Sequence, residues 1–470
     1  MTSSSAYQLP DGDSVFLAME TDVSKAHIGS LTLLDPSSSP DFSFAGFVDH
    51  VGKRLELVPR FTWKLKEVPL GFDNPYWVEN PDFDYRKHIH RIAVPSPGSV
   101  QELAKLASYL HEQPLDRSRS LWELWFIEGV ADGKCALYMK VHHCLMDGAS
   151  GAGLSEVLAD LTPDADRPMV VPEVYDEATP REPTSWELLR NGLRNDSNRR
   201  RALVGHLGRG LKEMALEALG QSEAPLVDEV PRVSFNGQLS KRRGLAYASL
   251  PLEKVKDLKK HFDVKVNDVV LAVVSSALRR YLRDRDELPE QPLVVMCPVS
   301  TRAADDAKLE NQITQMSLPI ATDEGDPIAR LAEIHANSNR AKEEVKAGSF
   351  DILNAMGESL SPGLMSMLVG AADLAGDSGP LPGNFVVSNV RATPVPLYLA
   401  GARVDTLMPM SVLATGQGLN VTVVSYCDKI DIGLTVDPEM VPDAWHLAEY
   451  FPAALDELES AAEGVVHRAR

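Results

Sequence analysis

The chain is poor in cysteine, and its cysteines are badly placed to act together. Cys135, Cys144, Cys297 and Cys427 lie far apart and form no C-x-x-C pair. That spacing is typical neither of a zinc site nor of a disulfide framework, and it fits a reducing compartment.

Long apolar runs are also missing. No stretch reaches the ~18 apolar residues that a transmembrane helix requires. The N-terminus, "MTSSSAYQLPDGDSVFLAMETD", has neither a basic n-region nor an apolar h-region, so we expect no signal peptide. We therefore predict a cytoplasmic protein that touches a membrane or a lipid droplet only from the side.

Positively charged residues are also scarce. Lys and Arg total 47 against 67 Asp and Glu, which gives a formal net charge of -20. Such a surface repels nucleic acid on average, and no nucleic-acid motif offsets it, so we expect no nucleic-acid partner. The helical segment 190–212 is locally basic; it is either a solvated face or a contact for phosphate groups or lipid headgroups.

What the chain does contain is an alternation of helical and strand patterns over 470 residues, which predicts a mixed α and β protein with two or three domains. Ser99 and Glu102 form a capping-box pattern before a helix. A second helix is predicted with Asn267 in the N-cap position. Residues 419–438 read as a hairpin with its turn near Asp428-Lys429.

A proline-rich stretch divides the chain, because proline disfavours both helices and central strands. We predict an N-terminal half over 1–162, a crossover with the basic helical segment over 163–234, and a C-terminal half over 235–470. Farther on, 352–376 is apolar enough to lie on a membrane surface, although a pair of core helices broken at Pro362 is the alternative. The prolines of the dividing stretch are Pro163, Pro168, Pro172, Pro180 and Pro183.

The most informative stretch is "VHHCLMDG" at 141–148, which ends a period-2 strand. Strand parity puts His143 on the more apolar face and His142 on the more polar one. A histidine at the end of a buried strand is a suitable general base near neutral pH. Asp147 would orient that base or brace the turn through a distant arginine, and Gly148 suits the turn. A core histidine with satisfied hydrogen bonds is the alternative.

Other chemistries fit these residues less well. His142 faces away from His143, so the pair lacks the geometry of a metal site, and Cys144 is on the wrong face for a Cys-His pair. Ser150 in "GASGA" lacks the last glycine of a nucleophile elbow, and "GQGLNV" lacks the third glycine of a dinucleotide loop. A base without a protein nucleophile implies direct transfer of a group to an acceptor.

The H-H-x-x-x-D-G string resembles that of CoA-dependent acyltransferases of the chloramphenicol acetyltransferase type and of peptide-synthetase condensation domains. The whole chain resembles more specifically the bacterial wax ester synthase/diacylglycerol acyltransferase family. The stretches that carry this resemblance, in order, include "DSVFLAMET", "PLDRSRSLWELWFIEG", "VNDVVLAVVSSALRRYL", "PVSTR", "NQITQMSLPI", "SNV" and "GQGLNVTVVSYCDKIDIGLTVDP".

The resemblance implies a mixed α/β fold of two chloramphenicol-acetyltransferase-like halves, a pseudo-dimer with the histidines in a central tunnel. It implies acyl-CoA as the acyl donor, diacylglycerol or a long-chain alcohol as the acceptor, and no metal or other cofactor. His143 would be the base and His142 would help to position it. Asp147 would pair with Arg302, and Asn267 of the Asn267-Asp268 pair would donate to the thioester oxygen, unless Asn267 is only a helix cap.

The remaining motif residues are implied to shape the site: Trp122 and Glu123 near the tunnel, and Ser388, Asn389, Gly416 and Gly418 in its wall. The chain departs from the family pattern at Ser120, Glu310 and Arg391-Ala392-Thr393. None of these positions is the base, so acyl transfer stands while acceptor preference is left open. The alternatives are transfer to a diol, sugar or amine, and an inactive protein that binds lipid or coats droplets.

Overall fold

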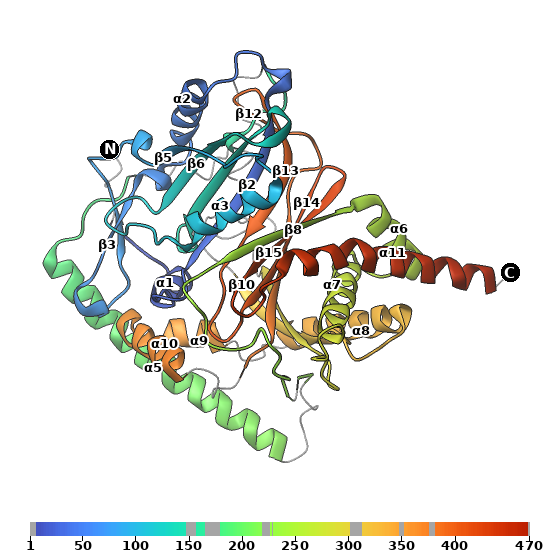
Figure 1. Cartoon of the computed structure of the whole chain (residues 1–470). Helices are drawn as coiled ribbons and strands as arrows, with labels where there is room; N and C mark the ends of the chain where they lie inside the picture. Colours follow the sequence, from blue (N-terminus) through green and yellow to red (C-terminus); the bar gives the residue numbers. More distant parts are fainter. Residues whose placement is uncertain are drawn as a thin grey trace.

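The computed structural model describes residues 6–146, 157–164, 179–218, 226–227, 229–300, 313–346, 352–375 and 381–468. Within these ranges the strands form two six-stranded sheets and a small three-stranded one. Figure 1 shows the two large sheets side by side, each with its own helices. The prediction of a mixed α/β protein built from two halves is confirmed.

The first large sheet carries the double histidine at the end of a central strand. Its order is β12-β13-β2-β7-β6-β5, and β7 pairs antiparallel with β2 from Cys135↔Leu34 to His142↔His27. Its strands are β2 (His27–Asp35), β5 (Ile89–Ala93), β6 (Trp122–Glu128), β7 (Cys135–His142), β12 (Tyr398–Leu399) and β13 (Ala402–Met410).

The second large sheet has the order β10-β9-β11-β14-β15-β8. The predicted hairpin is present in it, and the turn between β14 and β15 holds Cys427 at φ 53°. Its strands are β8 (Gly244–Pro251), β9 (Val294–Ser300), β10 (Ile313–Pro319), β11 (Phe385–Arg391), β14 (Leu419–Tyr426) and β15 (Lys429–Val436). The small sheet joins β1 (Tyr7–Gln8), β4 (Tyr76–Val78) and β3 (Lys64–Lys66).

Helices cover both sheets, with α3 against the first and α7, α8 and α11 against the second (Figure 1). The described helices are α1 (Asp11–Ala18), α2 (Phe44–Leu55), α3 (Val100–Glu112), α5 (Ser185–Ala218), α6 (Leu252–Phe262), α7 (Val266–Arg283), α8 (Pro327–Lys346), α9 (Ile352–Ser359), α10 (Pro362–Ala375) and α11 (Ala444–Arg468).

One strand joins the two halves. β13 comes late in the chain, yet it pairs antiparallel with β2 from Arg403↔Asp35 to Met410↔Gly29. On its other side the Leu407 N–H donates to the carboxylate of Asp431 in β15, at 3.1 Å. The later part of the chain thus completes the first sheet, while the division at 162 and 235 stays a prediction.

The N-termini of α3 and α7 can be compared with the predicted caps. The capping box of α3 is present, since the Ser99 hydroxyl accepts from the Glu102 N–H and the Glu102 carboxylate accepts from the Ser99 N–H. The N-cap prediction for Asn267 is wrong, because α7 already begins at Val266 and Lys265 caps it. A lysine gives no cap signal of its own; the Asp268 carboxylate accepts its backbone N–H at 3.0 Å instead.

The segment 352–375 is a pair of helices with the predicted break at Pro362, and α10 is only partly in the core. It forms α9 and α10, with Pro362 as the first residue of α10, where its missing N–H costs nothing. Met365 is buried, whereas Met367 is 73% exposed, so each side of α10 meets a different environment.

Both faces of β7 are covered, including the more polar one. Leu137 and Val141 join one core cluster and Tyr138 joins another, beneath α3, so both faces are buried. Lys140 on the predicted polar face is only 1% exposed, because α3 covers that face. The sequence pattern predicts which residues share a face of the strand, but the packing of α3 on the sheet decides that both faces are buried.

Two more buried histidines lie beside this strand. His27 donates from Nε2 to the His111 carbonyl oxygen at 2.6 Å, and His111 Nδ1 lies 2.7 Å from the Tyr138 hydroxyl. Burial lowers the pKa of His27 well below its ordinary value and that of His111 to about 3. Both rings are therefore neutral in the folded protein at neutral pH.

We predict that stability falls as the pH drops below ~6.5, where unfolded histidines take up protons that the folded chain does not bind. Each such histidine removes about 1.4 kcal/mol from the free energy of unfolding per pH unit until its folded pKa is reached. Urea unfolding at about pH 7.5 and about pH 5 measures this loss, above the range in which most carboxylates titrate.

The matched pair of variants is His111→Gln, which removes a buried ring, and His261→Gln, on the exposed surface of α6. His111→Gln should flatten the pH dependence, and His261→Gln should leave it as it is. A wild-type profile that is flat over this range would contradict the argument.

Candidate active site

The two histidines stand where β7 ends. His142 is the last strand residue and is fully buried. His143 starts the turn and is partly exposed; its N–H still donates to the Ala26 carbonyl oxygen at 2.8 Å. The parity argument therefore applies to His142 alone, because the strand stops one residue before His143. The side chains of His142 and His143 nevertheless lie in different surroundings, one buried and the other partly exposed.

The His142 ring accepts a hydrogen bond from the backbone of the turn that follows it. Its Nδ1 accepts from the N–H of Cys144 at 3.1 Å, which leaves the ring proton on Nε2. Nε2 lies 3.6 Å from Oε2 of Glu20. Burial lowers the pKa of His142 and Glu20 opposes that shift. His142 is thus a neutral ring held between a backbone donor and a carboxylate.

Glu20 is in turn held by Arg117. Its Oε2 accepts from Nε of Arg117 at 2.9 Å and from Nη2 at 2.6 Å. Burial raises the pKa of Glu20, but His142 and Arg117 outweigh burial and hold it at about 2. Sequence reasoning missed both residues as site residues. They lie inside "DSVFLAMET" and "PLDRSRSLWELWFIEG", two stretches of the family resemblance, and no local pattern links them.

The His143 ring lies flat on a phenylalanine. Phe16 of α1 and His143 stack with ring centroids 3.8 Å apart and planes inclined by 9°. A face-to-face stack fixes the plane of the imidazole while its two nitrogens stay at the ring edge. Phe16 also escaped sequence reasoning, since an aromatic residue on a short helix gives no signal of its partner.

The structure brings together two of the predicted residues from the second half. Nδ2 of Asn389 in β11 donates to Oδ1 of Asn267 in α7 at 3.2 Å. This bond uses the carbonyl half of Asn267, so its NH2 half is the part that can donate to a ligand. Beside it, the fully buried Asp268 accepts from Nδ1 of His335 at 2.6 Å. That histidine of α8 was not predicted.

Four residues of the predicted site lie outside the described ranges. They are Asp147 and Gly148 of the histidine string, Arg302 as the partner of Asp147, and Glu310 among the departures. The predicted pairing of Asp147 with Arg302 therefore stays a prediction.

Trp122 and Glu123 sit in the framework of the first half. The indole N–H of Trp122 donates to the Phe61 carbonyl oxygen at 2.7 Å, and its ring stacks on His88. Glu123 Oε2 lies 3.0 Å from Nζ of the buried Lys140 across the β6–β7 pair. The pair neutralises a buried charge, which would otherwise be costly. Both side chains thus stabilise the packing of the first half, and their place near a tunnel stays a prediction.

The remaining motif residues lie in the loop before β14 and in β11. Gly416 has φ +82°, a conformation that suits glycine. A Cβ on Gly418 would lie 2.5 Å from Sδ of Met440, so only glycine fits there. Ser388 pairs in register with Thr422 of β14. A place for these residues in a tunnel wall stays a prediction.

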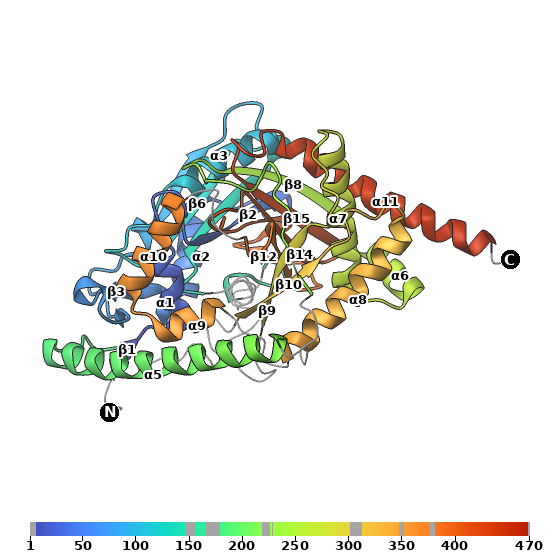
Figure 2. The same ribbon diagram turned by 90° about the horizontal axis from the view of Figure 1, so that it is seen from below.

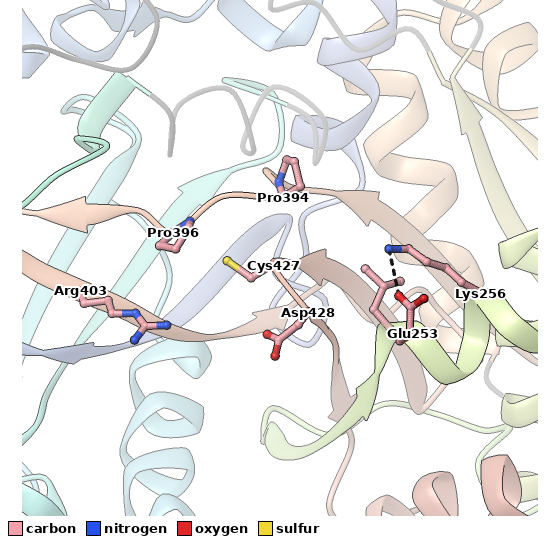
Figure 3. Close-up of a pocket in the computed structure, with 8 residues that line it drawn as sticks. Glu253, Lys256, Pro394, Pro396, Arg403, Cys427 and Asp428 are labelled. Carbon is pink, nitrogen blue, oxygen red and sulfur yellow. Dashed lines mark ion pairs between the residues drawn. The ribbon is translucent and has the colours of Figure 1, made fainter.

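The described residues hold no group of three or more His, Cys, Asp or Glu side chains arranged for a metal ion. A surface pocket of about 420 Å³ lies at the turn between β14 and β15 (Figure 3) and mixes two cations with two carboxylates. None of its lining residues is a predicted site residue: Leu252, Glu253, Lys256, Pro394, Pro396, Arg403, Cys427 and Asp428.

Comparison with known proteins gives one consistent result. The model of the wax ester synthase/diacylglycerol acyltransferase catalytic domain matches residues 9–270, and that of the WS/DGAT C-terminal domain matches 309–459. A putative diacylglycerol O-acyltransferase of Mycobacterium tuberculosis is 33% identical over 95% of this chain and 89% of its own. A second relative from that organism, the probable diacylglycerol O-acyltransferase tgs2, is 32% identical over 96% of this chain and 98% of its own.

Solved structures agree in fold. The wax ester synthase/diacylglycerol acyltransferase from Marinobacter aquaeolei VT8 superposes with a TM-score of 0.70 at 28% identity, covering 97% of this chain and 100% of that one. The first condensation domain of the calcium-dependent antibiotic synthetase reaches 0.57 at 16% identity, covering 98% of this chain and 97% of that one. The second likeness concerns the fold alone.

We predict that Glu123→Gln lowers the free energy of unfolding by about 2 kcal/mol, because it leaves the buried Lys140 ammonium without its carboxylate. Urea unfolding at neutral pH measures the loss. The control is Glu128→Gln in the same strand, which breaks only the exposed pair with Arg91 and should change stability little. Equal effects of the two substitutions would contradict the assigned role of Glu123.

Proposed function

The chain belongs to the wax ester synthase/diacylglycerol acyltransferase family, and on that premise we propose that His143 is its general base. The protein is an acyl-CoA-dependent O-acyltransferase, with diacylglycerol or a long-chain alcohol as acceptor. The observation that carries the proposal is the environment of the double histidine: a partly exposed ring stacked on Phe16 beside a neighbouring ring that is buried and anchored.

The reaction is a direct transfer. His143 takes the proton of the acceptor hydroxyl while the oxygen attacks the thioester carbonyl carbon. The resulting oxyanion accepts a hydrogen bond from the NH2 group of Asn267. The C–S bond then breaks, the CoA thiolate takes the proton from His143, and an ester and CoA leave.

The state of the cysteines supports a route without an acyl-enzyme. Cys144 is next to the base in sequence, but it is fully buried, and burial raises its pKa well above its ordinary value. Burial likewise raises the pKa of Cys135 and of Cys297 to about 12. Such thiols hold their protons at neutral pH and are poor nucleophiles.

We predict that His143→Ala lowers turnover by about 10²–10⁴-fold while the protein stays folded. The measurement is CoA release from palmitoyl-CoA with diacylglycerol, hexadecanol or no acceptor, alongside thermal unfolding of the same preparation. The control is His261→Ala, which removes an exposed histidine from α6.

Acceptor-dependent release that disappears only in His143→Ala would support the proposal and identify the acceptor. Wild-type turnover in His143→Ala would refute it. If the wild-type protein binds palmitoyl-CoA but releases no CoA, diols, sugars and amines are tested as acceptors. No release with any of these would favour an inactive lipid-binding protein.

We also propose peripheral association with an anionic membrane or droplet surface, from which long-chain substrates would reach the site. Among the described residues no helix is long and apolar enough to cross a bilayer. Exposed apolar side chains instead cluster on α5, on α10 and on the turn η3 (Pro69–Gly71). They are Leu70, Trp186, Leu189, Leu193, Leu203, Val204, Leu364, Met367 and Leu368.

These three elements adjoin one another. Gly363 of α10 packs so closely on η3 that a Cβ there would lie 2.6 Å from the Leu70 carbonyl oxygen. A Cβ on Gly192 of α5 would lie 2.7 Å from the Phe72 ring. Figure 2 shows α5 along one side of the molecule with α9 and α10 beside it.

The charge on α5 fits an anionic lipid partner. Although the chain carries a net charge of -20, α5 exposes Arg190, Arg194, Arg200 and Arg201 along the stripe that also exposes Trp186. Apolar side chains flanked by arginines are typical of helices that lie in the headgroup region.

We predict that the double substitution Leu193→Glu with Met367→Glu weakens binding to phosphatidylglycerol/phosphatidylcholine vesicles by about tenfold or more. Each change replaces an apolar contact with the lipid by a negative charge that the anionic lipid repels. Vesicle flotation measures binding, with Val395→Glu as the control at an exposed apolar residue elsewhere. No wild-type binding, or equal loss in the control, would refute the proposed surface.

A further inference from the structure

We infer that Glu20 and Arg117 are positioning residues for the general base, acting through His142 and α1. This inference rests on the proposed role of His143 and adds two residues that never touch the substrate. Its basis is the set of hydrogen bonds that surround His143 on both sides in the chain.

The backbone of the turn is fixed before and after His143. The His143 N–H donates to the Ala26 carbonyl oxygen at 2.8 Å, which joins the turn to the residue before β2. The next N–H, that of Cys144, donates to Nδ1 of His142 at 3.1 Å. The Leu145 N–H donates to the His142 carbonyl oxygen at 2.9 Å. The orientation of the His142 ring therefore decides where the backbone presents His143.

Glu20 determines that orientation. His142 is fully buried, and its Nε2, on the side of the ring away from the turn, lies 3.6 Å from Oε2 of Glu20. Because Nδ1 accepts a hydrogen bond, Nε2 carries the proton and favours a negative partner. Glu20 provides that charge at all physiological pH values, since its pKa is held at about 2.

Arg117 connects Glu20 to Phe16, the residue whose ring stacks on His143. Besides holding Glu20, its Nη2 donates to the carbonyl oxygen of Leu17 at 2.9 Å. Leu17 follows Phe16 in α1, and Phe16 is the ring on which His143 stacks. One arginine–glutamate pair thus fixes both the backbone of the base, through His142, and the plane of its imidazole, through Phe16.

The same arginine offers a matched control. Nη1 of Arg117 lies 3.7 Å from Glu67, whose side chain is 55% exposed. Glu67 shares the arginine with Glu20, but it raises the pKa of His142 only through its charge at a distance, and more weakly than Glu20 does. Glu20→Gln and Glu67→Gln each remove one negative charge near Arg117 without changing side-chain size.

We predict that Glu20→Gln lowers kcat by about 10- to 100-fold, the usual cost of losing a group that orients a reacting residue. KM for palmitoyl-CoA should stay within about twofold, because Glu20 does not contact substrate. Glu67→Gln should leave both constants as they are. Arg117→Lys should lower kcat in the same direction as Glu20→Gln, because a lysine cannot hold Glu20 and the Leu17 carbonyl together.

A double-mutant cycle separates positioning from general loss of structure. His142→Asn keeps a side-chain acceptor for the Cys144 N–H but cannot reach Glu20, so adding Glu20→Gln to it should cost little further activity. Glu20→Gln would be merely structural if it lowered the unfolding temperature while kcat per folded protein stayed constant. That result, or a full additional loss in the His142→Asn background, would overturn the inference.

The outcome is distinguishable from failure of the proposed function. If wild-type protein transfers acyl groups, His143→Ala does not, and Glu20→Gln matches the wild type, only the positioning role is refuted. If His143→Ala transfers acyl groups as well as the wild type, the proposed base is wrong, and Glu20 and Arg117 have no base to position.

Discussion

The site depends on a neutral histidine that is buried against a charged carboxylate. Removing both groups from water is costly, and the cost is tolerated because each group has a defined partner: the Cys144 N–H on one side of His142, and Arg117 behind Glu20. A buried pair of this kind has few alternative arrangements. It therefore converts an ordinary strand end into a turn with one geometry, on which the neighbouring His143 depends.

The second constraint is the joining of the two halves. His143 comes from the first sheet, whereas Asn267 and Asn389 come from α7 and β11 of the second. β13 inserts into the first sheet beside β2 and bonds to β15 through Asp431. The proposed base, His143, and the proposed oxyanion donor, Asn267, can face one substrate only if this connection fixes the two halves relative to each other. Functions that look local in the sequence therefore rest on a strand more than 250 residues away from the histidines.

Several features were predictable because they depend on neighbours in the chain. The capping box at Ser99 and Glu102 involves residues three apart, and the β14–β15 hairpin joins adjacent strands. One local inference was wrong: the cap at Asn267, because α7 begins one residue earlier and Lys265 holds the cap position. The burial of the more polar face of β7 could not be inferred from the strand alone, because α3 covers it.

The residues alone pointed to the available chemistry: the His142-His143 string at a strand end, cysteines that form no C-x-x-C pair, and the family resemblance. Tertiary structure alone decided what holds that chemistry in place. Arg117 and Glu20 are 97 residues apart, and Phe16 and His143 belong to different elements, so no periodicity relates them. Hydrogen bonds and ring stacking act over a few ångströms in space, and only the folded chain specifies which distant residues come that close.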